Sequence, residues 1–201
     1  AGRIGSPKHK IYMNDIRMYV YISASSTKIA KVYFDVAEEL GRLLAEKKIN
    51  LINGAGCIGL MAATSDATLE AGGTVTGVIP HFMVEQGWHH TGLTRLIETE
   101  TMHERKRMMA DLSDGVIALP GGCGTLEELL EIITWKQLGL YLNPIIILNI
   151  NGFYNPLLEC CKGRWRVILC VRACCDLEGG FNSRRSDKFA LYNACLEQGN
   201  T

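Results

Sequence analysis

The 201-residue sequence predicts an α/β fold, a doubly wound parallel sheet flanked by helices in a single domain. Its strand-like runs are apolar throughout rather than alternating with polar residues, as expected for strands that are covered on both faces. Segments with apolar residues at helical spacing separate these runs, which is the repeated β-α order of such sheets. Turns rich in glycine or serine follow several runs, and open α/β sheets bind ligands at that edge, beyond the carboxyl ends of the strands.

The composition indicates a globular protein and argues against several kinds of partner. Hydrophobic residues make up 47% of the chain and charged residues 21%, as in ordinary domains. The formal net charge is zero, so no overall field favours nucleic acid or an anionic membrane. The sequence shows no apolar run of transmembrane length and no signal peptide. We therefore expect a cytoplasmic protein with neither nucleic acid nor a membrane as partner.

The first expected elements follow a short leader. Residues 1–12 lack a hydrophobic period and indicate a disordered or expression-derived leader, so the folded domain is placed at residues 13–159. A strand is expected at 18–22 and a helix at 29–44, with a polar turn between them. In that turn, Ser25 and Ser26 are candidates either to cap the helix or to donate hydroxyls to a phosphate.

A glycine pattern follows the second expected strand, residues 49–52. Gly54-Ala55-Gly56-Cys57-Ile58-Gly59 is a literal G-x-G-x-x-G before another helix. A dinucleotide site of this kind needs an acidic residue at the end of the next strand, but that strand, residues 74–79, ends in Pro80-His81. We therefore favour a glycine loop for a nucleotide, or for tight helix packing, over an NAD site.

Residues 80–95 are expected to form a loop that covers a substrate, because long loops often carry function. The loop holds three histidines, which raises the question of a metal. His89 and His90 are adjacent, however, and no Asp or Cys stands nearby at ligand spacing. We predict no metal site.

A basic segment precedes the next strand. Residues 101–109 are predicted to open a helix, with Thr101 and Glu104 as a capping box. Three successive cations at residues 105–107 are unfavourable against the positive end of the helix dipole. Their placement suggests an anion nearby, and the alternative is a solvated basic face.

A strand at 115–119 leads into Pro120-Gly121-Gly122-Cys123-Gly124-Thr125, and a helical pattern follows. Glycines let the backbone approach a ligand closely, and the first N–H groups of a helix bind anions, most often phosphate. Thr125 and Glu128 also fit a capping box, a role that can coexist with ligand binding. A strand at 144–150 and a helix from residue 153 complete the domain.

Two motifs in order resemble a known family. Residues 120–128 match PGGxGTxxE, and residues 102–106, Met-His-Glu-Arg-Lys, match the MHxRK motif that precedes it. Both resemble the Lonely Guy family of cytokinin riboside 5′-monophosphate phosphoribohydrolases, formerly described as lysine decarboxylases. The resemblance covers roughly residues 18–159. It implies a Rossmann-like homodimer without a cofactor, which hydrolyses a nucleoside 5′-monophosphate, cytokinin nucleotide or AMP, to a free base and ribose 5-phosphate.

The same resemblance implies the site. Arg105 and Glu128 are the expected catalytic residues, since a carboxylate can stabilise an oxocarbenium-like sugar or activate water, and an arginine can bind sugar or phosphate oxygens. A non-catalytic carrier of a nucleotide or molybdenum cofactor is the alternative on this fold, although a carrier needs no carboxylate at the sugar. The expected substrate-binding residues are Gly121, Gly122, Gly124, Thr125, Lys106, Met102, Glu85, Ser25 and Gly56.

The family pattern ends near residue 159. Residues 160–201 hold six of the eight cysteines and five arginines. They contain no C-x-x-C spacing, so zinc is not expected, and the absence of a signal peptide argues against a disulfide framework. We interpret this segment as a divergent or frame-shifted Cys/Arg-rich tail.

Overall fold

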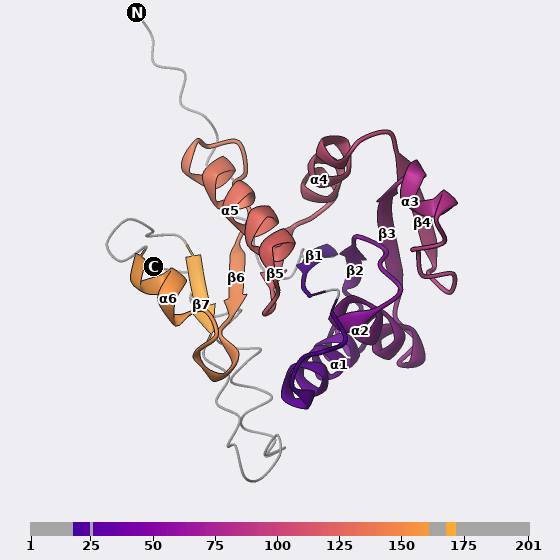
Figure 1. The fold of residues 1–201 in the computed structure, drawn as a ribbon, viewed down its shortest axis with the longest axis horizontal. Helices are drawn as coiled ribbons and strands as arrows, with labels where there is room; N and C mark the ends of the chain where they lie inside the picture. Colours follow the sequence, from indigo (N-terminus) through magenta and orange to yellow (C-terminus); the bar gives the residue numbers. More distant parts are fainter. Residues whose placement is uncertain (1–17, 25, 161–167, 172–201) are drawn as a thin grey trace, which may run out of the picture.

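The computed structural model describes residues 18–24, 26–160 and 168–171, and in this part of the chain seven strands form one parallel sheet (Figure 1). The strand order is β4-β3-β2-β1-β5-β6-β7. The strands are β1 (Met18–Ile22), β2 (Asn50–Asn53), β3 (Val75–Pro80), β4 (Arg95–Thr99), β5 (Gly115–Ala118), β6 (Ile145–Leu148) and β7 (Ile168–Val171). The helices are α1 (Lys31–Glu46), α2 (Gly59–Glu70), α3 (His81–Glu85), α4 (Met102–Asp111), α5 (Cys123–Gln137) and α6 (Asn155–Cys160), with a 3₁₀ turn η2 (Ile150–Gly152).

The order of the strands reverses at β1. Tyr19 of β1 is in register with Leu51 of β2 on one side and with Gly115 of β5 on the other. The chain therefore builds outward from β1 to β4 and then returns to start the other half at β5. The helices that follow β1 and β5, α1 and α5, pack on opposite faces of the sheet. This is a topological switch point, where doubly wound sheets bind their ligands.

Two apolar cores cover the two faces of the sheet. Neighbouring residues of a strand point to opposite faces, so Tyr21 belongs to one core and Val20 to the other. The first core contains Ala37 and Leu40 of α1, and the second contains Leu129 of α5. Figure 1 shows α1 and α2 on one side of the central strands and α4 and α5 on the other. The predicted doubly wound α/β fold is confirmed.

The loop prediction for residues 80–95 is wrong in part. The segment begins with the short helix α3 and ends where β4 begins at Arg95. β4 is an edge strand, and its residues Arg95 and Glu98 are exposed. Its mixed polar and apolar sequence therefore lacks the continuous apolar run that marks the central strands.

The turn after β1 and the two ends of the chain are the subject of further expectations. α1 begins after Ala30, and the Ser26 hydroxyl accepts a hydrogen bond from the Lys28 N–H, so Ser26 does not cap this helix. The alternative for Ser26, a hydroxyl donated to a phosphate, stays a prediction. Ser25, residues 1–12 and most of residues 160–201 lie outside the described residues. The domain limits therefore stay a prediction, although β7 falls beyond residue 159 and pairs with β6. None of the helices in the described ranges is long and apolar enough to cross a membrane.

Candidate active site

Hydrogen bonds join three loops at the switch point. The Ala24 N–H, just after β1, donates to the Pro120 carbonyl after β5 at 3.3 Å. The Ala24 carbonyl accepts from the Leu60 N–H, in the first turn of α2, at 3.0 Å. The turns after β1, β2 and β5 are therefore held together at one edge of the sheet, as the sequence predicts.

The turn after β5 uses its glycines in two ways. A Cβ on Gly121 would stand 2.0 Å from the Oγ1 atom of Thr125, whose side chain is buried, so Gly121 is needed for packing. A Cβ on Gly122 or Gly124 would meet no atom within 4 Å. The absence of side chains at these two positions keeps the first N–H groups of α5 open to a ligand rather than relieving an internal clash.

The start of α5 corrects one prediction. α5 begins at Cys123 with Gly122 as its N-cap, so Thr125 lies inside the first turn. The predicted capping box of Thr125 and Glu128 is therefore wrong. At α4 the predicted cap by Thr101 is confirmed, because its hydroxyl accepts from the Glu104 N–H at 3.1 Å. The Glu104 carboxylate accepts from the N–H of Glu100, one residue before the N-cap, at 2.9 Å, so the return bond of the capping box is shifted by one position.

A buried tyrosine fixes the base of this turn. The Tyr154 hydroxyl donates to the Leu119 carbonyl at 2.5 Å, immediately before Pro120. Tyr154 is itself held by a hydrogen bond from its N–H to the Asn149 side chain at 2.8 Å. A residue after β6 therefore supports the glycine turn after β5.

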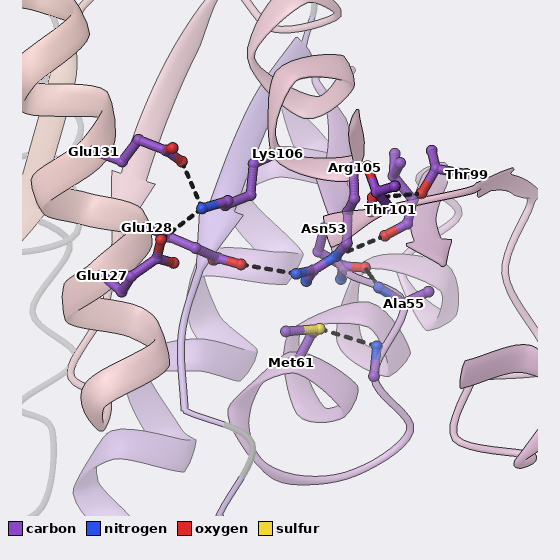
Figure 2. Close-up of polar contacts among 12 residues, drawn as sticks. Asn53, Ala55, Met61, Thr99, Thr101, Arg105, Lys106, Glu127, Glu128 and Glu131 are labelled. Atoms are coloured by element: carbon purple, nitrogen blue, oxygen red, sulfur yellow. Dashed lines mark hydrogen bonds and ion pairs between the residues drawn. The ribbon is translucent and has the colours of Figure 1, made fainter. Parts of the chain in front are cut away.

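Arg105 lies almost entirely inside the protein, with 6% of its surface exposed. Its Nε atom donates to the Val78 carbonyl of β3 at 3.1 Å, and its Nη1 atom donates to Glu128 Oε1 at 2.9 Å (Figure 2). A Cβ on Gly54 would stand 1.7 Å from Nη2. The guanidinium is thus held between β3, the glycine loop after β2 and α5.

Glu128 is a carboxylate in a largely dry environment. Its side chain is 16% exposed, and burial raises its pKa while the Arg105 guanidinium acts in the opposite direction. The two residues are 23 positions apart in sequence, on α4 and α5, and meet through their side chains. An arginine and a carboxyl group with a perturbed pKa, side by side near the switch point, are a candidate catalytic pair.

Lys106 also points toward α5. Its Nζ atom lies 2.5 Å from Glu127 Oε1 and 2.9 Å from Glu131 Oε2, and its side chain is 9% exposed (Figure 2). Figure 2 shows Lys106 directed at the carboxylates on either side of Glu128. All three cations expected to meet an anion thus meet protein carboxylates, which lie on α5 for Arg105 and Lys106 and within α4 for Arg107. The third, Arg107, pairs with Asp111 and stacks on Trp135.

The remaining predicted residues stand apart from this pair in their described contacts. Met102 is exposed at the first position of α4. Glu85 is exposed at the end of α3, 3.5 Å from the His81 ring. The Gly56 N–H points at the Met61 sulfur at 3.0 Å, and Gly56 forms an isolated bridge with His89. Their roles in binding stay predictions, as does that of Ser25.

The sequence patterns leave out Asn53 and include Gly54 only as part of the G-x-G-x-x-G pattern. Asn53 is fully buried; its amide donates to Ser65 at 2.8 Å and accepts from the Ala55 N–H at 2.9 Å, which holds the glycine loop. Gly54, the first glycine of the G-x-G-x-x-G pattern, gives room to Arg105. The G-x-G-x-x-G pattern marks Gly54 but does not show that Arg105 packs against it. Across the described ranges, no group of three or more His, Cys, Asp or Glu residues could hold a metal.

Comparisons with known proteins agree with this arrangement. A family profile described as possible lysine decarboxylase matches residues 61–166. The chain is 42% identical over 167 residues to cytokinin riboside 5′-monophosphate phosphoribohydrolase of Rhodococcoides fascians, a match that covers 77% of this chain and 82% of the relative. It is 46% identical over 142 residues to the LOG5 enzyme of the same name from Arabidopsis thaliana, covering 71% of this chain and 62% of that relative.

Solved structures share the fold. The molybdenum cofactor binding protein of Rippkaea orientalis superposes with a TM-score of 0.65 at 19% identity, covering 90% of this chain and 98% of the other. The molybdenum cofactor carrier protein of Chlamydomonas reinhardtii superposes with a TM-score of 0.64 at 18% identity, covering 91% of this chain and 99% of the other. At such low identity the likeness concerns the fold alone. The chain spans less than two thirds of the length of the plant relative quoted above.

Proposed function

The chain belongs to the family of cytokinin riboside 5′-monophosphate phosphoribohydrolases, and we propose that it hydrolyses the N-glycosidic bond of a nucleoside 5′-monophosphate to a free base and ribose 5-phosphate. The observation that carries the proposal is the Arg105–Glu128 pair, 2.9 Å apart and largely buried near the switch point of the sheet. The relatives named for this reaction match the chain at 42% and 46% identity.

The pair suits the chemistry of glycosidic cleavage. The bond breaks through an oxocarbenium-like state, in which positive charge develops on the sugar. The Glu128 carboxylate stabilises that charge or takes a proton from the attacking water. Arg105 keeps the carboxylate in one orientation through Nη1, and a further N–H of its guanidinium would bind an oxygen of the sugar or phosphate.

The 5′-phosphate is assigned to the N-terminus of α5. Gly121, Gly122, Gly124 and Thr125 form this turn, and a Cβ at 122 or 124 would project into open space. Unpaired N–H groups and the positive end of the dipole favour a phosphate there. Binding of the phosphate, remote from the bond that breaks, then positions the ribose for the reaction.

The experiment offers two substrates that differ in the base. The protein is incubated with AMP and with isopentenyladenosine monophosphate, and the free base and ribose 5-phosphate are quantified. Release of both products in equal amounts is expected from at least one substrate, and Arg105→Ala serves as the matched variant that should lose turnover. Preference between the two separates a cytokinin-activating enzyme from a general AMP nucleosidase. Absence of products from both would contradict the proposal.

The carrier alternative makes a different prediction for the same assay. A nucleotide or molybdenum-cofactor carrier would bind its ligand and leave it intact. Nothing in the Arg105–Glu128 pair serves such a role, because retention of a ligand does not require a carboxylate held beside an arginine. Amino-acid decarboxylation is not favoured either, since it needs a lysine in the setting of a pyridoxal site.

We also propose that the active form is a homodimer. Leu138, Leu140 and Leu142, at the end of α5 and just beyond it, are 68%, 61% and 77% exposed. A close series of exposed leucines of this kind supports a protein interface. Light scattering at micromolar concentration should report about twice the chain mass of 22.2 kDa; a fully active monomer would contradict the dimer. The cytoplasmic compartment stays a prediction.

A further inference from the structure

Lys106 is nearly buried between two carboxylates that flank Glu128. Its Nζ atom lies 2.5 Å from Glu127 and 2.9 Å from Glu131, and these two residues stand one helical turn apart on α5. Glu128 lies between them in sequence. The side chain of Lys106 is therefore occupied on both sides by protein groups rather than presented to an open ligand site.

The surroundings make these charges interact strongly. Lys106, Glu128 and Glu131 share the wall of a cavity of about 30 Å³, whose other lining includes Val20 and Trp135. That volume is far below the several hundred Å³ of a typical ligand pocket. Lys106, Glu128 and Glu131 lie in this small, mostly apolar space, where charges are poorly screened and affect the ionisation of their neighbours. Glu127, whose side chain is 57% exposed, acts more weakly because solvent screens it.

The charge balance of α4 and α5 depends on Lys106. Three carboxylates, Glu127, Glu128 and Glu131, face two cations of α4. Arg105 pairs with Glu128, and Lys106 pairs with the other two. Glu127 raises the pKa of Glu128, after the larger effects of burial and Arg105, and Lys106 lowers it. Removal of Lys106 would leave two unpaired like charges beside Glu128, which disfavours its ionised form.

We propose that Lys106 is a positioning residue for the Arg105–Glu128 pair: it binds Glu127 and Glu131, fixes α4 against α5 and neutralises the two carboxylates beside Glu128. The inference rests on the proposed function for its effect on turnover. It differs from a role beside the nucleotide, because Lys106 acts here through Glu128 and contacts no substrate atom.

Charge-balanced variants test this role. Lys106→Met should lower kcat about tenfold or more at neutral pH, with little change in KM, and should move the acid limb of the kcat profile to higher pH. The triple variant Lys106→Met, Glu127→Gln, Glu131→Gln should recover most of the turnover and the original limb, since no carboxylates remain to be neutralised. Lys106→Arg, which keeps the charge, should retain part of the activity. Arg107→Gln removes a neighbouring exposed cation as the matched control and should behave as the unmodified protein.

A second measurement does not depend on the reaction. The carboxyl carbon of Glu128 is followed by NMR during a pH titration of each variant. Its midpoint should rise in Lys106→Met and return in the triple variant. If the unmodified protein hydrolyses no nucleotide, the proposed function fails, while this titration still decides the role of Lys106.

Three results would overturn the inference, and the third concerns the triple variant. One is an unchanged Glu128 titration in Lys106→Met. Another is a raised KM in both Lys106→Met and the triple variant with unchanged pH limbs, which would place Lys106 on the nucleotide. If Lys106→Met does not fold, as urea melts would show, the triple and Lys106→Arg variants carry the comparison, and an inactive but folded triple variant contradicts the proposal.

Discussion

Arg105 lies against the backbone of Gly54 so closely that a Cβ at position 54 would stand 1.7 Å from Nη2 and 2.8 Å from the central guanidinium carbon. The arginine cannot give way easily, because its Nε is bonded to the Val78 carbonyl and its Nη1 to Glu128. Position 54 therefore has to be glycine for a spatial reason, independent of any positive backbone angle.

Gly54→Ala should displace the guanidinium and lower kcat/KM by about 10²-fold, comparable with the loss of one preorganised donor. The decisive comparison is a double-mutant cycle measured with AMP. If Gly54 acts only by giving room to Arg105, Gly54→Ala should cost nothing further in an Arg105→Ala background. Additive losses would mean that the glycine serves the substrate directly.

Glu128→Gln tests whether turnover needs the negative charge of Glu128 or only a side chain of its size and shape. Glutamine keeps an oxygen that accepts from Arg105 Nη1, so the side chain should stay in place. Loss of the negative charge should lower kcat by about 10²-fold or more. Because α5 begins at Cys123, Glu128 has no capping role to lose. Turnover and a urea melt are measured together; native turnover would remove Glu128 from the mechanism.

The free energy of unfolding of the unmodified protein, compared with that of Glu128→Gln, should fall as pH rises. Burial raises the pKa of Glu128 above its ordinary 4.5 despite the opposing effect of Arg105. Between the two pKa values the folded protein binds more protons than the unfolded chain, so its free energy of unfolding falls as pH rises. Glu128→Gln lacks this titration. The stability of the unmodified protein relative to the variant should therefore decline above about pH 4.5 in urea melts. A relative gain with rising pH would show that Arg105 outweighs burial.

Gly124→Ala should improve stability and impair binding. The residue lies in the first turn of α5, and a Cβ there meets nothing within 4 Å. Replacing glycine by alanine in a helix stabilises by up to about 1 kcal/mol. A phosphate held by the first N–H groups would, however, be crowded by the methyl group, so KM for AMP should rise. A more stable variant with unchanged KM would place the phosphate elsewhere.

The sequence revealed the sheet better than the site. The central strands are mostly apolar, and the sequence predicts their positions within one or two residues, for example 115–119 against Gly115–Ala118. β4 was missed because an edge strand with an exposed Arg95 and Glu98 lacks such an apolar stretch. The cap of α4 followed from Thr101 and Glu104, while the cap of α5 was misplaced because glycines can also precede a helix.

Arg105 and Glu128 were singled out by family motifs rather than by geometry. Spacing in sequence does not predict that two residues 23 positions apart touch, because their helices follow strands that the sheet order places on opposite sides of β1. For the same reason neither the contact of Gly54 with Arg105 nor the burial of Lys106 could be foreseen. Local patterns also do not show which glycine serves packing, as Gly121 does, and which faces open space.

The central position of β1 has a consequence for synthesis of the chain. β1 can pair with β2 once residue 53 has emerged from the ribosome, but its other neighbour, β5, begins only at residue 115. The interval is 62 residues (115 − 53), which takes several seconds at about 5–20 residues per second. During that time one edge of an apolar strand lacks its native partner and can pair wrongly with other chains. The strand at the centre of the mature sheet is thus the one that the nascent chain must shield for longest before its second neighbour is made.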